Sequence, residues 1–314
     1  MQSTTLNMNW KFWKSTKKKS KTREWIDALV FAVIAATIIR AFLIEAFTIP
    51  TPSMENSLMV GDFLFVSKVS YGPRGPITPL AFPLVHQKLP LLGTKSYSEA
   101  VQWKYKRFPG FGNVERFDAV VFNYPMEDDR PIDKKTHYIK RCIGLPGDSL
   151  RIDNRSVYIN GNAIEDPKGV QKKYTIQTDG SPLNARTLEK LGVTEGGAVF
   201  GTGQYHFLCT AEQAQQIKDF ANVVNVQASI EQNYNRVYPY SPELDWNKDN
   251  YGPIFLPTAG STVPLNSVTA SIYHRVITVY EGNDFQVQDG TYLINGQPVT
   301  SYTFEMDYYW LMGD

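Results

Sequence analysis

The chain has 314 residues, enough for one large domain or two ordinary ones with a sizeable core. A formal net charge of +1 at pH 7 gives no global attraction for nucleic acid, and we expect no nucleic-acid partner. The two cysteines, Cys142 and Cys209, are too few for a disulfide framework, and the sequence leaves open whether they pair. None of the four histidines has a partner at metal-ligand spacing, so we expect no metal site.

The first 24 residues carry a dense positive charge. Lysine or arginine recurs at seven positions, and no acidic residue precedes Glu24. Such clusters stay on the cytoplasmic side of a membrane span that follows them. We therefore predict a basic cytoplasmic tail over residues 1–24. Its basic residues are Lys11, Lys14, Lys17, Lys18, Lys19, Lys21 and Arg23.

An apolar run follows, and we predict one transmembrane helix over residues 25–46. Its uninterrupted core, 28–39, has 12 residues, fewer than the roughly 20 that span a bilayer. Arg40 lies near the far end, however, and its long side chain can reach the interface. The competing interpretations are a cleaved signal peptide, a buried core helix and an interfacial amphipathic helix. A poor cleavage site argues against the first, and apolar residues on every face argue against the last.

The stretch FTIPTPSMENSL, residues 47–58, leaves the predicted span with a stiff backbone. Pro50 and Pro52 fix their own φ angles and favour extended conformations in the residues before them. We expect an extended strand or a turn that holds Ser53 at a defined place. The simpler interpretation is a linker at the membrane exit, where proline and hydroxyl residues are common.

Strand signals dominate beyond this stretch. Alternation over 61–72 and a short apolar run over 116–125 each predict a strand. Residues 138–164 predict strands separated by a Pro-Gly turn and a polar turn, and closed by an Asn-Gly hairpin turn. The best helix signals are at 183–192 and 210–224.

Residues 72–93 are rich in proline and apolar side chains and fit neither a helix nor a regular strand. We expect this loop either to touch the membrane surface or to pack on the core, and the sequence leaves both open. An exposed apolar patch would mark the first arrangement.

Residues 138–164 match residues 273–299 at an offset of 135 without a gap. The Asn-Gly pairs near the ends of both stretches coincide, and the apolar pattern matches as well. One hairpin module used twice would explain the match, and chance convergence of two Asn-Gly hairpins is the alternative. In this alignment Lys140 meets Arg275, and an arginine cannot act as a base.

Ser53 and Lys140 are the candidates for nucleophilic catalysis. No Ser–His–Asp pattern is visible, so a serine nucleophile would need a lysine to take its proton. Lysine can do this when burial lowers its pKa from about 10.4 towards neutrality. Lys140 has apolar neighbours on a predicted strand, which offers a dry face. An ordinary surface lysine is the alternative.

Four motifs resemble the ordered boxes of type I signal peptidases: PTPSMENSLMVGDFLFVSKVSYG, RFDAVVFNYP, YIKRCIGLPGD and WLMGD. These enzymes are membrane-anchored Ser–Lys endoproteases of the bacterial export system, serine peptidase family S26. The resemblance covers about 47–72, 116–164 and 306–314, together with the anchor. Residues 73–115 and 165–272 match nothing that can be carried over.

The resemblance implies a role for each matching residue. It implies Ser53 as the nucleophile, Lys140 as the general base, and Thr51 as an oxyanion donor beside the backbone N–H of Ser53. On an extended strand, a residue two positions before Ser53 points to the same face. The resemblance also implies shallow apolar pockets that admit small side chains and exclude bulky ones. The residues implied to line them are Phe47, Ile49, Pro50, Met54, Leu58, Tyr138 and Ile139.

The chain departs from the family pattern in two places. Asn56 stands where many members have proline, and Pro52 precedes the serine instead, so we expect a local difference in the turn. The chain ends at Asp314, where the family's last box continues with Asn, Ser, Asp and Arg residues that buttress the lysine. We expect either a fragment or a protein shorter than its relatives. A fragment would be weakly active or inactive, because its lysine would lack that support.

The resulting prediction is a mostly β protein, with a distorted antiparallel β-barrel catalytic core and an inserted lobe behind one transmembrane helix. The core is expected over 47–164 and 273–314, and the lobe over 165–272. The resemblance implies removal of signal peptides from exported preproteins through an acyl-enzyme, without metal or cofactor. It implies a single-pass protein of the inner membrane, with a cytoplasmic N-terminus and a periplasmic or extracytoplasmic catalytic domain. Signal peptides, the lipid bilayer and the secretion translocase are the expected partners.

Two other functions stay open from the sequence. A cytosolic Ser–Lys self-cleaving regulator would need a DNA-binding domain in place of the anchor, and none is visible. A non-catalytic, membrane-anchored β-domain would bind exported peptides or an assembly partner. Replacing Ser53 or Lys140 by alanine distinguishes this last function from the protease, because only the protease would lose cleavage.

Overall fold

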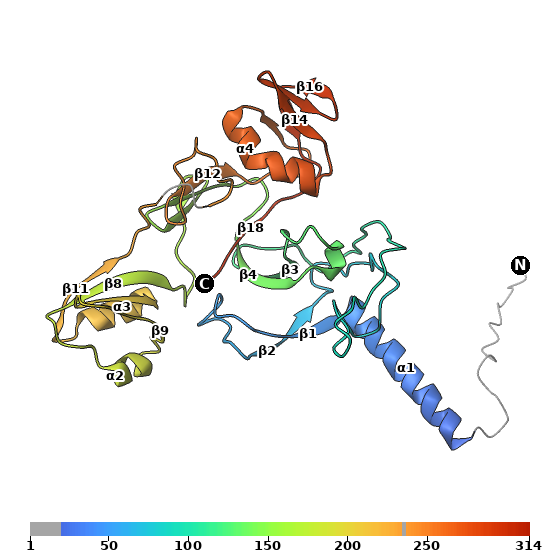
Figure 1. Cartoon of the computed structure of the whole chain (residues 1–314), viewed down its shortest axis with the longest axis horizontal. Helices are drawn as coiled ribbons and strands as arrows, with labels where there is room; N and C mark the ends of the chain where they lie inside the picture. Colours follow the sequence, from blue (N-terminus) through green and yellow to red (C-terminus); the bar gives the residue numbers. More distant parts are fainter. Residues whose placement is uncertain (1–19, 234–236) are drawn as a thin grey trace, which may run out of the picture. The chain divides into compact units, whose positions relative to one another are not determined.

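The computed structural model describes residues 20–233 and 237–314 (Figure 1). The chain divides into two compact units. The first unit contains the N-terminal part up to Ala46 and two later stretches, 65–112 and 123–136. The second unit contains the remaining stretches, 47–64, 113–122 and 137–314. The predicted basic tail lies outside the described residues as far as residue 19.

The first unit begins with helix α1 (Lys21–Phe42). Ser20 caps it by accepting a hydrogen bond from the backbone N–H of Arg23. Its length and a mean hydropathy of 2.0 suit a membrane span, and none of its side chains is buried. The helix ends four residues before the predicted boundary, because the chain turns at Leu43 and strand β1 (Ile44–Thr48) follows.

A charged cluster closes the end of α1. Arg40 pairs with the buried Glu45 at 2.7 Å and donates to the backbone carbonyl of Leu84 at 2.6 Å. Lys68 pairs with the second oxygen of Glu45 at 2.8 Å. Two cations therefore compensate the buried carboxylate, and the loop that contains Leu84 is tied to the helix end.

The proline-rich loop over 72–93 has a buried part and an exposed part. Its Ile77 and Thr78 are buried, so this part of the loop packs on the protein. Leu91 and Leu92 are 98% and 73% exposed, so another part of the loop presents apolar side chains outward. Whether those side chains touch a membrane stays a prediction.

The rest of the chain is mainly strands in small sheets, which confirms the mostly β class. Strands β1 and β2 (Phe63–Ser67) form one pair. A second sheet has the order β18-β4-β3, with bounds Trp310–Met312, His137–Gly144 and Ala119–Asn123. A third has the order β12-β5-β6-β7, with bounds Tyr251–Phe255, Ser149–Asp153, Ser156–Ile159 and Asn162–Ala163. Two further sheets are β13-β17 (Thr262–Pro264, Ser301–Thr303) and β14-β15-β16 (Phe285–Gln288, Thr291–Ile294, Gln297–Val299).

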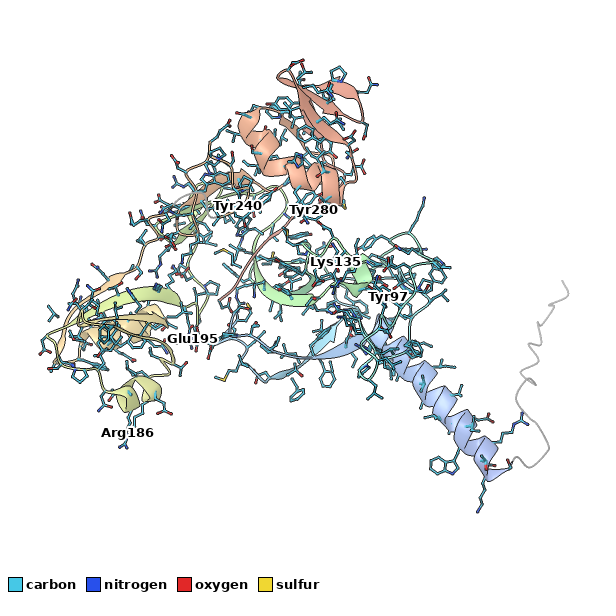
Figure 2. The ribbon with its side chains drawn as sticks, in the orientation of Figure 1. Tyr97, Lys135, Arg186, Glu195, Tyr240 and Tyr280 are labelled. Carbon is cyan, nitrogen blue, oxygen red and sulfur yellow. The ribbon has the colours of Figure 1, made fainter. Side chains whose placement is uncertain are left out.

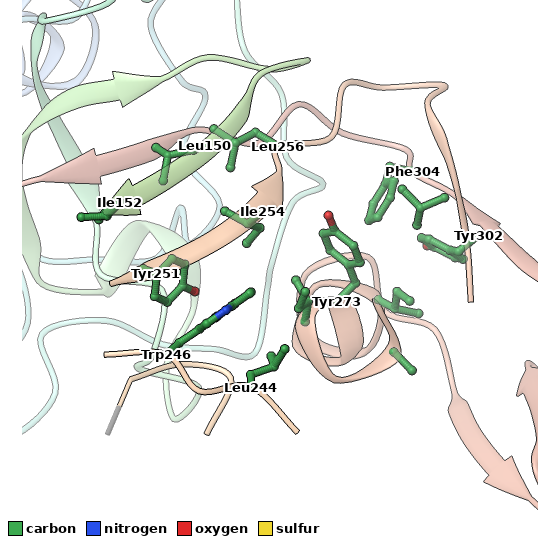
Figure 3. Close-up of a cluster of buried hydrophobic side chains, with 14 of the residues drawn as sticks. Leu150, Ile152, Leu244, Trp246, Tyr251, Ile254, Leu256, Tyr273, Tyr302 and Phe304 are labelled. Atoms are coloured by element: carbon green, nitrogen blue, oxygen red, sulfur yellow. The ribbon is translucent and has the colours of Figure 1, made fainter. Parts of the chain in front are cut away.

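Strands β5, β6 and β12 enclose the main hydrophobic core together with helix α4 (Ser267–Arg275), as Figure 3 shows. Leu150 and Ile277 are fully buried there, and Phe304 is almost so. Tyr273 fills the same core and satisfies its hydroxyl by donating to the carbonyl of Phe255 at 2.7 Å. Strand β5 of this core follows β4 directly in the chain.

The internal repeat is preserved in three strands of each copy. Strands β5, β6 and β7 correspond to β14, β15 and β16 at the offset of 135. Asn160 and Asn295 both have a φ of 52°, and each accepts a hydrogen bond at 2.9 Å from the backbone N–H of Ser149 or Asp284. The same turn chemistry in both copies supports one hairpin module used twice.

The upstream part of the repeat does not adopt the same structure. Residues 138–144 belong to β4, whereas 273–280 finish α4 and continue as a π-helical turn, η3 (Val276–Tyr280). The sequence match therefore does not extend to a shared structure in this part of the two copies. Asn266 begins a helix there through a capping box with Thr269, and residues at helical spacing bury one face of that helix. The buried side chains of α4 are Ala270, Ile272 and Tyr273, and Ile277 continues the buried set in η3.

A separate lobe lies between β7 and β12 in the chain. Its sheet has the order β11-β8-β10-β9, with bounds Val223–Ala228, Lys172–Thr178, Gln204–Cys209 and Glu195–Val199. The two expected helices are present but shorter, as α2 (Ala185–Lys190) and α3 (Ala211–Lys218), and the end of the second predicted helix belongs to β11 instead. The lobe has its own apolar core. Figure 2 labels Arg186 and Glu195 in this lobe. The predicted lobe boundaries at 165 and 272 stay a prediction. Outside this lobe, the first unit also contains a short 3-10 helix, η2 (Ile132–Lys134).

Candidate active site

Ser53 lies on a turn that follows β1. The turn is closed by backbone hydrogen bonds from Glu55 to Pro52 at 2.8 Å and from Leu58 to Met54 at 2.7 Å. Met54 is fully buried and anchors the turn, while Ser53 is exposed. Of the two backbone geometries expected from the sequence, the structure therefore has the turn.

Lys140 reaches this serine from the middle of β4. Its Nζ hydrogen-bonds to the Oγ of Ser53 and donates to the carbonyl of Ile139 at 3.0 Å. Partial burial lowers the pKa of the Lys140 ammonium, and the nearby carboxylate of Asp314 opposes part of that shift. The pair is separated by 87 positions in sequence, and β4 and the turn bring it together.

Thr51 lies beside the pair. Its hydroxyl oxygen is 3.4 Å from the Oγ of Ser53, and the side chain is exposed. A hydroxyl at this distance can donate to a negative oxygen that develops on a substrate carbonyl held at Ser53. The structure thus brings together all three residues that the sequence singled out for chemistry.

The residues expected to line apolar pockets differ in accessibility. Ile49 and Met54 are buried, so their side chains are the least accessible of the set. Phe47 is half-buried and its ring lies 4.9 Å from the ring of His137 at the start of β4. The ring of Tyr138, which is 40% exposed, lies 6.3 Å from that of Phe122. The remaining members are Leu58 and Ile139, which are half-buried, and Pro50, which is exposed.

A polar clamp that sequence reasoning missed holds the turn against β4. Arg141 donates from two nitrogens to the carboxylate of Asp314, whose side chain is 1% exposed. Ser57 donates to the same carboxylate, and Arg141 also donates to Ser57 at 3.0 Å and to the carbonyl of Phe117 at 2.8 Å. The only sequence signals were the arginine that follows Lys140 and the aspartate of the MGD motif.

The backbone of Gly313 completes this clamp. The N–H of Asp314 donates to the carbonyl of Ser53 at 3.2 Å. A Cβ on Gly313 would lie 2.5 Å from the same carbonyl oxygen, so only glycine permits this close approach. The end of β18 therefore sets the position of the Ser53 backbone.

This geometry can support serine-based acyl transfer. It supplies a hydroxyl nucleophile, a lysine with a lowered pKa in hydrogen-bond contact with it, and a neighbouring hydroxyl donor. Strand β1, which precedes Ser53, and strand β4, which contains Lys140, also carry apolar side chains.

Comparison with known proteins gives consistent similarities. Residues 22–227 match a protein family described as "Signal peptidase, peptidase S26". Signal peptidase I of Bacillus licheniformis is 27% identical over 217 residues, which cover 62% of this chain and 92% of that protein. Signal peptidase I P of Bacillus subtilis subsp. natto is 32% identical over 48% of this chain and 57% of its own length. Signal peptidase I of Buchnera aphidicola is 29% identical over 76% of this chain and 68% of that protein.

Proposed function

The chain belongs to the signal peptidase family, peptidase S26, and from this membership we propose that it removes signal peptides from exported preproteins with Ser53 as nucleophile and Lys140 as general base. The observation that carries the assignment is the hydrogen bond between Lys140 Nζ and Ser53 Oγ. The chain spans 57% of the Bacillus subtilis relative, so the activity of the whole protein is inferred from the shared part.

The first half of the reaction forms an acyl-enzyme. Neutral Lys140 accepts the hydroxyl proton of Ser53 as Oγ attacks the carbonyl carbon of the scissile peptide bond. The hydroxyl of Thr51 and the backbone N–H of Ser53 stabilise the oxyanion. When the intermediate collapses, the C–N bond breaks, and Lys140 returns the proton to the leaving amine of the mature protein.

The second half releases the signal peptide. Lys140, neutral again, takes a proton from a water molecule that attacks the ester carbonyl. The ester bond to Oγ breaks and Ser53 regains its proton from Lys140. A lowered lysine pKa favours both halves, because only the unprotonated amine accepts a proton.

Substrate choice follows from the apolar surface beside the pair. The side chains before the cleavage point would contact the more accessible members of the apolar set, with the buried Ile49 and Met54 beneath them. These accessible members are Phe47, Pro50, Leu58, Tyr138 and Ile139. Shallow pockets of this kind accept alanine-sized side chains and reject larger ones by volume.

Helix α1 would span the inner membrane once. The basic N-terminal tail supports a cytoplasmic N-terminus, which leaves the catalytic residues on the outer side. Ser53 follows the end of α1 by 11 positions, so the nucleophile stays near the surface where preproteins emerge from the secretion translocase.

Alanine variants test this function. Ser53→Ala and Lys140→Ala should each abolish cleavage of a preprotein by the full chain in detergent or lipid. Lys140→Arg should also be inactive, because an arginine keeps its proton. Ser156→Ala and Lys173→Ala, on exposed strand positions of the second unit, are the matched controls and should cleave normally. Cleavage that survives Lys140→Ala would refute the Ser–Lys mechanism. A Ser53→Ala variant that binds signal peptides as well as wild type but does not cleave them would be consistent with that mechanism.

A further inference from the structure

An aromatic–basic segment, residues 101–111, stands out on the surface of the first unit. Its sequence is VQWKYKRFPGF, with aromatic and basic side chains interleaved and no acidic residue. Trp103 is 56% exposed and Phe111 is 90% exposed, and Tyr105 and Phe108 are exposed as well. Large aromatic side chains rarely gather on a surface that faces only water.

The exposure is built into the fold and does not come from a frayed loop. The segment runs beside residues 69–77 through backbone hydrogen bonds from Gly75 to Lys106 at 2.8 Å and from Phe108 to Pro73 at 2.9 Å. Gly72 has a φ of 84°, and a Cβ there would lie 1.9 Å from the carbonyl oxygen of Phe108. This tight pairing fixes the backbone, so the aromatic side chains cannot simply fold back inside.

Helix α1 places this segment at the membrane surface. The ring of Phe42, the last residue of α1, lies 6.2 Å from the ring of Phe108 in an edge-on contact. The 22 residues of α1 span about 33 Å at 1.5 Å per residue, close to the thickness of a bilayer's hydrocarbon core. Given the proposed membrane span of α1, on which this site depends, Phe108 lies at the level where the chain leaves the bilayer.

The composition of the segment matches that level. Tryptophan and tyrosine are enriched where a membrane meets water, because the ring is apolar and the N–H or O–H group is polar. Lys104, Lys106 and Arg107 add three positive charges. Arg107 is already engaged with the hydroxyl of Tyr105 at 2.8 Å and the carbonyl of Gly72 at 2.8 Å, which leaves the exposed lysines to meet anions.

We propose that the aromatic–basic segment is an interfacial binding site for anionic phospholipids, a second attachment of the protein to the bilayer beside α1. The rings of Trp103, Tyr105 and Phe111 enter the headgroup region, and Lys104 and Lys106 bind phosphate oxygens. A protein partner is disfavoured as occupant because Phe108 of the segment contacts Phe42, the last residue of a helix whose length matches the bilayer.

Lipid-quenching of a fluorophore on the full chain tests the site. Cys142 and Cys209 are buried, so a thiol-reactive probe labels only an introduced cysteine. Gly112→Cys places the probe next to the segment without replacing any of its side chains, since nothing lies within 4 Å of a Cβ there. Gly197→Cys in the lobe is the matched control, with equally open surroundings. Ala35→Cys reports the middle of α1.

The vesicles contain phosphatidylcholine with or without phosphatidylglycerol, and lipids brominated on the acyl chain serve as quenchers. We expect quenching at positions 35 and 112, stronger at 112 with phosphatidylglycerol, and none at 197. The double variant Lys104→Glu/Lys106→Glu should remove the phosphatidylglycerol effect, and Phe111→Ser should weaken quenching at 112 in both lipids.

Three results would overturn the site. The probe at position 112 could be as little quenched as the probe at 197 while the probe at 35 is quenched, which would leave the aromatic–basic segment for a protein partner. Equal quenching in both lipids that resists the charge reversal would refute binding of anionic headgroups. No quenching at 35 would remove the membrane span itself. The readout is fluorescence quenching and not cleavage. Failure of the lipid site and failure of the proposed peptidase activity can therefore be told apart.

Discussion

A methyl group added at Gly313 tests whether the residues that follow β18 position Ser53, the proposed nucleophile. In Gly313→Ala the new Cβ would lie 2.5 Å from the carbonyl oxygen of Ser53, and real Cβ atoms stay at least 3.0 Å from such an atom. The Ser53 backbone must therefore move by at least about 0.5 Å, or β18 must withdraw by as much. Either movement also strains the hydrogen bond from Asp314 to Ser53.

The expected effect on catalysis is larger than the effect on folding. A misplacement of about 1 Å can cost about 100-fold in rate, so we expect kcat/KM for a preprotein to fall by about 10- to 100-fold. Overpacking at a tight contact destabilises by about 1–3 kcal/mol, which denaturant unfolding would measure. The loss should appear mainly in kcat, because the apolar residues that hold the substrate are unchanged.

Gly197→Ala is the control for this prediction. It also adds one methyl group to a glycine in the second unit, but nothing lies within 4 Å of the new Cβ. Cleavage and stability should stay within about twofold and about 0.5 kcal/mol of wild type. Wild-type kcat/KM in Gly313→Ala, or an equal loss in Gly197→Ala, would refute the positioning role of this backbone contact.

Three further predictions concern the pair and the repeat. The cleavage rate should rise with pH through a midpoint below 10.5, the ordinary pKa of lysine, because burial lowers the pKa of Lys140 and only its neutral form accepts a proton. A pH–rate profile with its midpoint at or above 10.5 would contradict this. Thr51→Val should lower kcat by about 100-fold through loss of an oxyanion donor while Thr51→Ser keeps most activity, and a valine variant as fast as wild type would remove that role. Asn160→Ala and Asn295→Ala should each cost about 1–3 kcal/mol of unfolding free energy, since alanine is strained at a φ of 52°; clearly unequal costs would argue that the two hairpins are not equivalent.

Local chemistry made several features predictable from the sequence. The Asn-Gly pairs determine the hairpins after β6 and β15, because asparagine followed by glycine suits the left-handed backbone of such turns. The apolar run determined α1, although its end was placed four residues too late. The resemblance of the ordered motifs around Ser53 and Lys140 to those of a known family implied the serine–lysine pair, and the structure brings these two residues into contact.

Other features depend on contacts between distant parts of the chain. Residues 273–280 carry a strand-like pattern, yet a capping box and burial of one face make them finish a helix. Ile49 and Met54 belong to a motif that implies pocket walls, and their burial depends on how the turn packs against the rest of the chain. Neither outcome can be read from a short window, because each depends on which apolar surface is available to cover the segment.

The sequence by itself indicated the class of chemistry and the residues proposed to perform it, since a candidate nucleophile, a candidate base and a long apolar run are properties of local motifs. Only the tertiary structure decided how the pair is held. The carboxylate of Asp314 meets Arg141 across 173 positions and Ser57 across 257, and Gly313 meets the carbonyl of Ser53. These contacts form only when β18 pairs with β4, and chain folding, not sequence proximity, places them there.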